Sequence, residues 1–474
     1  MKRPLSCILL LLLVLPAGAQ ERWDLRRCVD HALANNISVK QQDVQARLAR
    51  LTYDQAKLSQ YPNLALNVNT GLNSGRSIDR TTNQFTTETV FFNTFGLQSN
   101  VNVFNFFSTR NGIAAYRLDA LAAGANVEKV RNDIALNVAL VYLQVLQARQ
   151  QVEVLRVRQR QTGEQLATTR KQVNAGALPE LNAAQLEAQV AQDSANVVNA
   201  KTSEIQALYN LKALLALDAA QPFDVVTPPV ELIPVEPLAD LQPQNVYALA
   251  LQNLPQQRVN SLRVQSAQYQ VKAARGAMLP TFSLSGSLQS NISSNKNTPL
   301  VDQAVLKGYQ PVGLVQGTNQ VVLAPDFSYP FVSNPYFTQF RDNLSKGLVL
   351  GINVPIFNGG QLRTQWRRAQ LNVQTFTLQQ ELDSLTIKQD IYKAYADAIN
   401  ALEKFNAATK AVEAADKANT FAQKRYNIGL LSTLELINAQ TNLTTAQLQR
   451  ASAQFEYVFR MKLLEFYKGQ GLKL

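Results

Sequence analysis

The chain has 474 residues, of which 46% are hydrophobic and 17% charged, and its formal net charge is +12. This composition excludes a disordered polymer, and two cysteines are too few for a disulfide scaffold. A single histidine and the small number of cysteines leave few of the side chains that enzymes and transition-metal sites use. We therefore expect no catalytic residues, no metal site and no cofactor.

The first nineteen residues have the layout of a cleavable secretory signal. Lys2 and Arg3 precede an apolar run at 8–15, and small residues follow at 17–19. Cys7 stands before the apolar run, so lipidation is not expected. The sequence predicts an exported chain that begins near residue 20 after cleavage.

Lysine and arginine are scattered along polar helix faces. Arg156, Arg158 and Arg160 are spaced two apart, so they fan around a helix instead of forming one basic stripe. We interpret them as a solvated face and expect no nucleic-acid partner.

The chain repeats itself. Residues 32–68 align without a gap with residues 250–286 at an offset of 218, and an offset of 253 holds later in each half. At the later offset Tyr142 meets Tyr395 and Gly176 meets Gly429. The mature chain is therefore predicted to be two copies of one unit, of which the second carries an insertion.

Each copy is predicted to contain a helix that stops at a proline, two strands, a very long helix and a returning helix. The first repeat (20–217) has helix 24–60, strands 62–72 and 96–106, and helices 109–172 and 180–217. The second repeat (243–474) has helix 243–279, strands 280–290 and 346–357, and helices 362–425 and 431–467. A proline-rich linker at 218–242 joins the two repeats.

Each long helix of this prediction would reach roughly 95 Å, which is wider than a globular core. Apolar residues recur along it with alternating spacings of four and three, and a second apolar stripe runs beside them. The first of these stripes contains Ile134, Val138, Val141, Val145, Ala148, Val152 and Leu155. Such a helix is packed on two flanks and belongs in a wall of helices.

Each predicted strand has one apolar face and one face of small polar residues. Their length of about 9–11 residues is typical of bilayer-spanning strands that line a wet lumen, and the alternative is a soluble sandwich sheet. Four strands cannot close a barrel, and open edges are not tolerated in lipid. The chain would therefore share a barrel with copies of itself, and three copies would supply twelve strands.

The order of these elements resembles the TolC-like outer-membrane efflux factors over nearly all of the mature chain. The motifs that carry the resemblance are Leu33-Ala34-Asn35-Asn36, the strand entries at Pro62 and Pro280, the run 353–360, whose Pro355 is taken as a third strand entry, and Tyr426-Asn427-Ile428-Gly429 followed by Leu434-Glu435-Leu436. The resemblance implies an α+β membrane protein: a homotrimer whose 12-stranded β-barrel in the outer membrane continues into a periplasmic α-helical barrel.

The resemblance also implies partners and a function. They are a periplasmic adaptor (membrane fusion protein), an inner-membrane RND-type pump or ABC exporter, and outer-membrane lipid. The implied function is a passive outer-membrane channel of a tripartite efflux or type I secretion system in a Gram-negative-type bacterium. The alternative is a periplasmic coiled-coil structural or adaptor protein without a pore.

The family closes its periplasmic mouth with a gate, and the resemblance maps this gate onto five positions. Tyr426 keeps the family's tyrosine, and Glu435 stands where a pore-ring aspartate is expected. Leu431, Asn438 and Asn182 replace the charged residues of the family's polar lock. We therefore expect a gate that depends mainly on helix packing. A solvated helix carboxylate is the alternative for Glu435.

The turns between long and returning helices are the expected adaptor contacts, where small residues would allow close helix docking. The alternative role for their glycines is helix termination, which is compatible with docking. The docking positions are Asn174, Gly176, Leu178, Asn427, Gly429, Leu431 and Ser432.

Two further features have competing interpretations. His31 lies near Cys28 without a third ligand in sequence, so helix packing is favoured over a reactive site. Aromatic residues in the polar loops, among them Phe337 and Phe340, could cap the outer mouth or form a girdle at the membrane interface. The longer second loop, 291–345, is predicted to be the lid.

Overall fold

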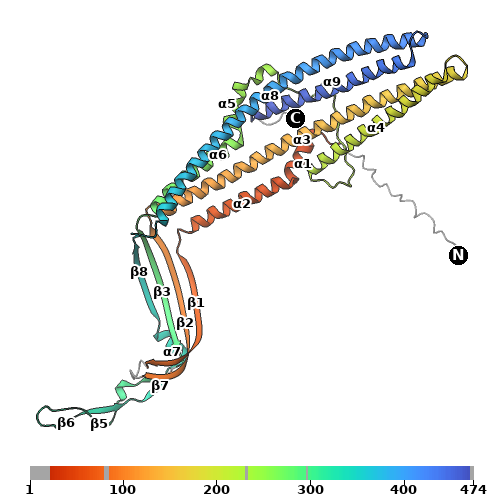
Figure 1. Ribbon diagram of the computed structural model, residues 1–474. Helices are drawn as coiled ribbons and strands as arrows, with labels where there is room; N and C mark the ends of the chain where they lie inside the picture. Colours follow the sequence, from red (N-terminus) through yellow and green to blue (C-terminus); the bar gives the residue numbers. More distant parts are fainter. Residues whose placement is uncertain (1–21, 79–84, 230–232, 295–296, 470–474) are drawn as a thin grey trace, which may run out of the picture. The chain divides into compact units, whose positions relative to one another are not determined.

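The computed structural model describes residues 22–78, 85–229, 233–294 and 297–469, so the predicted signal segment at 1–19 lies outside the described residues. The chain forms two compact units. The helical unit contains the chain up to Leu51, Arg117–Ala267 and the chain from Asn372 onward, and the strand unit contains Thr52–Tyr116 and Gln268–Leu371. Figure 1 gives the labels of the helices and strands used below.

The first helix of each repeat is two helices, so the prediction of one helix at 24–60 and another at 243–279 was wrong. The first pair is α1 (Leu25–Asn35) and α2 (Ile37–Leu58), and the second pair is α5 (Pro243–Asn253) and α6 (Pro255–Gly276). The second pair follows the first at a constant offset of 218 residues.

Local chemistry explains both breaks. Asn36 leaves the helical conformation at φ −58° and ψ 131°, and its side chain accepts a hydrogen bond from the Ser38 amide at 2.9 Å. The same side chain donates to the carbonyl of Leu214 at 2.9 Å, which ties the break to α4. At the second break Leu254 precedes Pro255, which disfavours helical torsion angles for Leu254.

Two very long helices dominate the chain. They are α3 (Ser108–Asn174) and α8 (Gln361–Asn427), with 67 residues each, or about 100 Å at the usual helical rise. The returning helices are α4 (Glu180–Leu215) and α9 (Thr433–Tyr467). No helix in the described ranges has both the length and the hydropathy needed to cross a membrane.

Two apolar clusters hold the helical unit together. One joins α1, α3, α4 and α9 through buried side chains that include Cys28, Val138, Leu211 and Phe455. The other joins α5, α8 and α9 through buried side chains that include Val246, Ile391, Met461 and Leu464. Both clusters draw on the four-three stripes of the long helices, so the periodicity of the sequence marks these inward-facing sides.

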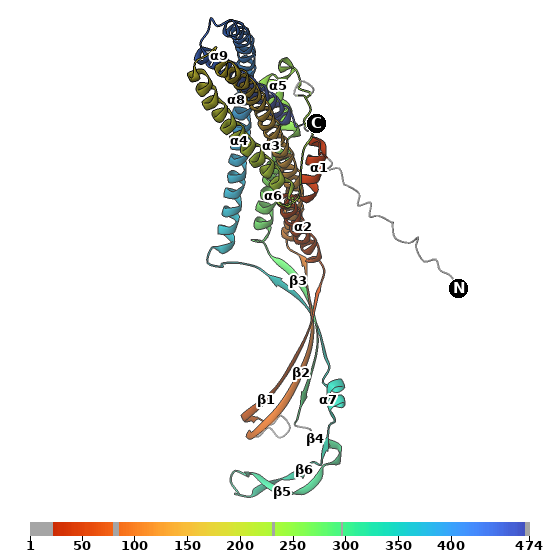
Figure 2. The same cartoon turned by 90° about the vertical axis from the view of Figure 1, so that its right-hand side faces the viewer.

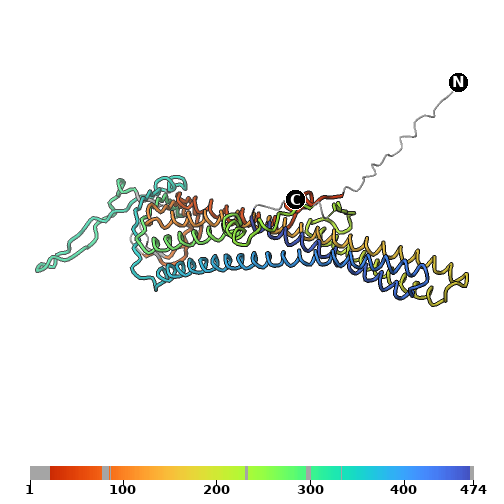
Figure 3. The backbone as a smooth tube through the Cα atoms, turned by 90° about the horizontal axis from the view of Figure 1, so that it is seen from above, coloured from red at the N-terminus to blue at the C-terminus, as the bar shows by residue number. Residues whose placement is uncertain are grey.

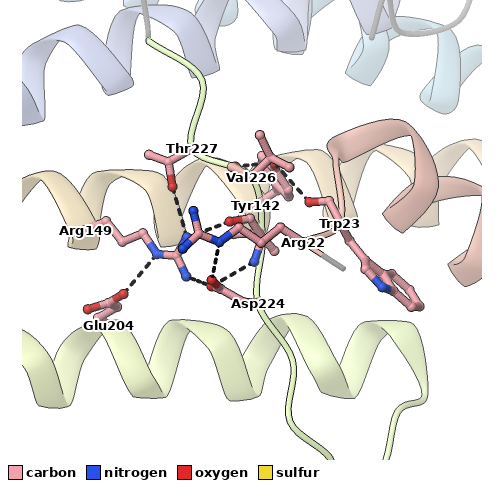
Figure 4. A network of polar contacts seen from close by, with 9 residues as sticks. Arg22, Trp23, Tyr142, Arg149, Glu204, Asp224, Val226 and Thr227 are labelled. Carbon is pink, nitrogen blue, oxygen red and sulfur yellow. Dashed lines mark hydrogen bonds and ion pairs between the residues drawn. The ribbon is translucent and has the colours of Figure 1, made fainter. Parts of the chain in front are cut away.

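A polar clamp holds the linker against the long helix α3 (Figure 4). Arg149 of α3 donates to Glu204 of α4 at 2.9 Å and also pairs with Asp224 of the linker. Tyr142 lies two helical turns before Arg149 on α3, and its hydroxyl donates to the carbonyl of Val226 at 2.6 Å. Burial is the main reason that the pKa of Tyr142 lies well above the usual value for tyrosine. The linker is therefore fixed by specific contacts, and it contains the short 3-10 helix η2 (Leu238–Leu241).

The strand unit contains one antiparallel four-stranded sheet of order β1-β2-β3-β8. Its strands are β1 (Asn63–Ile78), β2 (Phe85–Phe104), β3 (Thr281–Ser293) and β8 (Ser345–Asn353). Pro62 and Pro280 directly precede β1 and β3, as predicted for strand entries. The prediction of Pro355 as a strand entry was wrong, because Pro355 follows the end of β8 and the predicted strand 346–357 ends at Asn353. A proline has no backbone N–H to give to the sheet, so β8 ends before it. The strand β1 continues past the predicted end at residue 72, and β2 begins well before the predicted start at residue 96 but ends before residue 106.

The register of the sheet separates an apolar face from a polar face. Residues directly opposite one another share a face, and the pairs Leu66↔Leu97 and Leu284↔Leu350 lie on the same one. We call this side the apolar face of the sheet. The other side contains the residues between them and is dominated by asparagine, glutamine, serine and glycine. Much of the apolar face is exposed in the single chain, including Leu66 and Leu350.

The inserted segment between β3 and β8 has secondary structure of its own, although the sequence predicted only a loop at 291–345. A hairpin is formed by β5 (Val305–Leu314) and β6 (Val321–Ser328), and a short ladder by β4 (Asn297–Pro299) and β7 (Phe331–Ser333). A 3-10 helix, η3 (Val301–Gln303), and the helix α7 (Tyr336–Asp342) complete the segment. Figure 2 shows the β5–β6 hairpin beyond the end of the four-stranded sheet, and α7 beside the sheet near that end.

Candidate functional site: the helix turns and the residues behind them

The two turns between long and returning helices have the same backbone geometry. Gly176 and Gly429 adopt φ values of +75° and +77°, the left-handed region in which glycine has no steric penalty. In the first turn the amide of Ala177 reaches back to the carbonyl of Gln172 at 2.8 Å, and in the second Leu430 reaches Arg425 at 2.9 Å. These bonds satisfy the last carbonyls of α3 and α8, so each glycine terminates its helix.

The returning helices begin differently. Ser432 and Glu435 form a capping box at the start of α9, in which the Ser432 hydroxyl accepts from the Glu435 amide at 3.2 Å. The Glu435 carboxylate in return accepts from the Ser432 amide at 3.0 Å and from its hydroxyl at 2.7 Å. At the start of α4, Pro179 occupies the capping position and its side chain makes no capping hydrogen bond. The second turn is therefore the more firmly fixed of the two.

Glu435 is exposed, and its hydrogen bonds favour the ionised form. The side chain and then the backbone of Ser432 hold the pKa of Glu435 below the usual value of a glutamate. The carboxylate therefore carries its charge throughout the neutral range. Helix capping is a role for this residue that the sequence-based interpretation did not include, and it is compatible with a position beside a pore.

Tyr426, one of the predicted gate residues, lies among other polar groups. Its hydroxyl lies 3.2 Å from the Thr169 hydroxyl of α3 and 3.4 Å from the Thr433 hydroxyl of α9. Thr169 and Thr433 are both buried. Tyr426 thus connects the end of α8 with both α3 and α9. Within the described residues, the side chains of Leu431, Asn438 and Asn182 contribute no hydrogen bond to this cluster.

The turns also expose large apolar side chains that were not among the predicted docking positions. Ile428 and Leu430 flank Gly429, and 69% and 65% of their surfaces are exposed. Leu181 and Leu434, at the starts of the returning helices, are exposed as well. Among the predicted docking positions, Asn174, Gly176, Asn427, Gly429 and Ser432 are exposed, whereas Leu178 and Leu431 are half-buried. The apolar run Ile428-Gly429-Leu430-Leu431 could have revealed this surface, because such a run is unusual in a turn.

One predicted surface charge lies inside the helical unit. Arg158 of α3 is buried against Asp193 of α4, so its interpretation as part of a solvated face was wrong. The guanidinium also donates to the Gln440 side chain of α9 at 2.6 Å, and Asp193 accepts from the Thr162 hydroxyl at 2.7 Å. Burial lowers the pKa of Arg158, and the negative charge of Asp193 opposes this effect. The spacing of the three arginines gave no signal of this burial. Arg156 and Arg160, two residues away on either side, are exposed, and the sequence does not distinguish Arg158 from them.

His31 and Cys28 lie in packed surroundings. The His31 ring makes an edge-to-face contact with Trp23, with ring centroids 4.9 Å apart. Cys28 is completely buried, and burial raises the pKa of its thiol to about 12. These contacts agree with the helix-packing interpretation of both residues. No group of three or more potential metal ligands occurs among the described residues.

Comparison with known proteins identifies the family. The sequence profile of the family described as outer membrane efflux protein matches residues 28–217 and 246–460, which fall in the two repeats. The chain is 24% identical over 368 residues to the outer membrane efflux protein BepC of Brucella suis biovar 1, an alignment that covers 77% of this chain and 69% of BepC. It is 23% identical over 386 residues to the alkaline protease secretion protein AprF of Pseudomonas aeruginosa, covering 80% of this chain and 69% of AprF.

Solved structures agree with this result at the level of the fold. The structure of CusC superposes with a TM-score of 0.76 at 18% identity and covers 94% of this chain and 92% of CusC. The family profile matches well over half of the residues, and its match spans both long-helix pairs. The chain belongs to the outer membrane efflux protein family and is an outer-membrane channel protein of the kind used in efflux and secretion.

Proposed function

We propose that three copies of the chain form a passive duct through the outer membrane and periplasm. The observation that carries this proposal is the four-stranded sheet, which exposes an apolar face and has open edges at β1 and β8. An open edge in lipid leaves backbone groups without hydrogen-bond partners, so each edge needs another strand. Three sheets joined edge to edge would make twelve strands, with the apolar face toward lipid and the polar face toward a wet lumen.

Exposed apolar stripes on two helices support self-association. In the helical unit, both stripes follow the four-three spacing of a coiled coil. The α2 stripe consists of Ile37, Val44, Leu48 and Leu51, and the α8 stripe of Leu378, Leu382, Leu385 and Tyr392. Each helix also buries a different face inside the helical unit. Val39 lies on the buried face of α2, and Ile391 lies on the buried face of α8. The exposed stripes are therefore additional apolar surfaces that water disfavours.

The two stripes have the arrangement of a ring interface. Figures 1 and 3 show α2 and α8 along opposite sides of the helical unit, with α3 between them. A stripe on one side that fits a different stripe on the other side gives a head-to-tail contact, and such contacts close into a ring when the rotation from one subunit to the next is a whole fraction of a turn. We infer that α2 of each subunit packs against α8 of the next, which would enclose a helical barrel.

In this duct the helix turns form the periplasmic end. Tyr426, Leu431, Glu435, Asn438 and Asn182 are proposed to line or hold the gate, and the cluster of Tyr426 with Thr169 and Thr433 would keep neighbouring helices together. Exposed Ile428 and Leu430 offer apolar contact beside Gly429 for a periplasmic adaptor. Through the adaptor, an inner-membrane RND-type pump or ABC exporter would supply cargo and energy, and the choice of cargo would lie with these partners.

The alternative is a periplasmic coiled-coil structural or adaptor protein without a pore. It would share the long helices of this chain. The exposed apolar face of a long antiparallel sheet favours the channel, because a periplasmic protein would have to cover that face with protein.

Conductance in planar bilayers tests the duct, with the oligomer mass measured on the same detergent preparation. We expect a trimer with small conductance, and we expect Tyr426→Phe to raise it because the hydroxyl contact to Thr169 and Thr433 is lost. Tyr395→Phe is the matched control. The Tyr395 hydroxyl accepts a hydrogen bond from the Gln242 side chain at 3.3 Å, and this bond is remote from the turns. A monomer that forms no pores would overturn the proposal and favour the coiled-coil alternative.

A further inference from the structure

The helix α7 packs on one end of the four-stranded sheet through specific hydrogen bonds. Asn93 of β2 donates to the Tyr336 hydroxyl at 2.7 Å, and the Ser290 hydroxyl of β3 donates to the carbonyl of Phe340 at 2.7 Å. The buried side chain of Gln339 accepts from the Ser293 amide at 3.0 Å. The position of α7 on the sheet is therefore fixed by both backbone and side-chain contacts.

The register identifies which face α7 covers. Phe95 lies opposite Ser290, and Val68 lies opposite Phe95, so all three belong to the apolar face defined above. The Phe340 ring meets the Phe95 ring edge to face, with centroids 5.4 Å apart. Ser290 and Ile292 of the same face are only 1% and 4% exposed. The helix therefore lies on the apolar side of the sheet and not on the polar side.

The outward side of α7 pairs an aromatic ring with a cation. Phe337 and Arg341 are one helical turn apart, and 82% of Phe337 and 79% of the Arg341 side chain are exposed. Arg341 also pairs with Asp342 at 3.0 Å. Aromatic rings gather where the hydrocarbon of a bilayer meets its headgroups, and a guanidinium binds phosphate well.

We propose that α7 is a membrane-interface anchor, which places Phe337 at the lipid boundary and Arg341 among lipid phosphates. The inference rests on the proposed barrel, because the apolar face of the sheet must face lipid. The surface of α7 is continuous with that lipid-facing side through Phe340 and Phe95. The position on the apolar side assigns this aromatic group to the girdle and separates it from any lid over the lumen.

The height of α7 on the sheet agrees with this role. From the Thr281↔Asn353 pair at one end of β3 to Ser290 under α7 there are nine residues. At the usual rise these span about 30 Å along the strand, or about 23 Å along the membrane normal at a typical strand tilt of about 40°. The apolar band of an outer-membrane barrel is about 25 Å tall, so α7 would lie at its rim.

Fluorescence quenching by lipids tests the anchor in the full-length protein. The chain has two tryptophans, so Trp23→Phe and Trp366→Phe together give a background for single reporters. The reporter is Phe337→Trp, and the controls are Leu66→Trp on the apolar face and Asn67→Trp on the polar face of the same strand. Each variant is reconstituted in phosphatidylcholine vesicles with and without bromine near the start of the acyl chains.

We expect shallow bromine to reduce the emission of Phe337→Trp at least twofold and to leave Asn67→Trp unchanged. Quenching of Leu66→Trp but not of Phe337→Trp would overturn the anchor while leaving the barrel intact. If Leu66→Trp also escapes quenching, the orientation of the sheet is wrong and the proposed duct fails with it.

A spin label gives the same information without removing the native tryptophans. Phe337→Cys can carry a nitroxide, because the described native thiol of Cys28 is buried. The anchor requires the label to be accessible to dissolved oxygen in lipid and shielded from a water-soluble nickel chelate. Accessibility to the chelate as high as that of a label at Asn67 would overturn the proposal.

Discussion

The guanidinium of Arg158 lies 3.4 Å from the carboxylate of Asp193 in the helical unit, where each side chain is only 5% exposed. The pair connects α3 with α4, and the bond from Arg158 to Gln440 extends the connection to α9. Charges taken out of water need compensation, and this cluster provides it across three helices. It lies behind the turns, so it couples the helices that would carry the gate.

Arg158→Met is expected to destabilise the helical unit by about 3 kcal/mol, because Asp193 would remain buried without its partner. Denaturant unfolding of the detergent-solubilised protein, followed by helical circular dichroism, measures the change. The control is Arg170→Met, since the pair Arg170 and Glu187 joins the same two helices at an exposed position and its loss should cost less than about 1 kcal/mol. Equal effects of both substitutions would contradict a buried, compensated pair.

Glu435→Gln is expected to lower the preference of the channel for cations in single-channel recordings. Glutamine preserves the capping box, so the substitution removes the charge and leaves the helix start in place. Because the pKa of Glu435 is depressed, the wild-type preference should be lost at a lower pH than an unperturbed glutamate would give.

Ser432→Ala is the companion variant for Glu435. It keeps the carboxylate but removes the hydroxyl that is the largest cause of the low pKa. The cation preference should then disappear at a higher pH than in the wild type. Unchanged selectivity in Glu435→Gln would leave this residue with a capping role alone.

Cysteine pairs test the proposed contact between α2 and α8. In oxidised membranes, Val44→Cys combined with Leu378→Cys, Leu382→Cys or Leu385→Cys should produce bands of two and three linked chains on non-reducing gels for at least one pair. Each single variant should stay unlinked, because a head-to-tail interface brings two different stripes together. Dimers from Val44→Cys alone would show a symmetric contact instead, and a trimer without links in any pair would place the interface elsewhere.

Deletion of the β5–β6 hairpin tests the predicted lid. The sequence assigned this role to the whole loop 291–345, but residues 336–342 belong to α7, which is packed on the sheet. The test variant replaces residues 305–328 with a short glycine-serine linker and retains α7. Its conductance should be higher than that of the wild type if the hairpin restricts the outer mouth. Conductance equal to that of the wild type would remove the hairpin from consideration as a lid.

Periodicity was the most informative sequence signal. The four-three stripe of α3 marks side chains that are buried in the structure, among them Val138, Val145 and Val152, because a regular helix turns residues at this spacing to one side. The break at Asn36 was missed, although the Asn36 side chain caps the Ser38 amide locally, and its bond to Leu214, which is 178 residues away, leaves no mark in the local sequence. The break at Leu254 had a local signal in Pro255 that the longer helical pattern obscured.

By itself the sequence determined the duplicated order of helices and strands and the two faces of the sheet, since these depend on local spacing and on proline and glycine chemistry. Tertiary structure decided which polar residues are buried: Arg158 differs from Arg156 and Arg160 only in the neighbours that other helices bring to it. It also decided the side of the sheet on which α7 lies, because that depends on the pairing of Phe95 with Ser290 across two repeats. Such long-range contacts arise only when distant segments pack, and no single stretch of sequence encodes them.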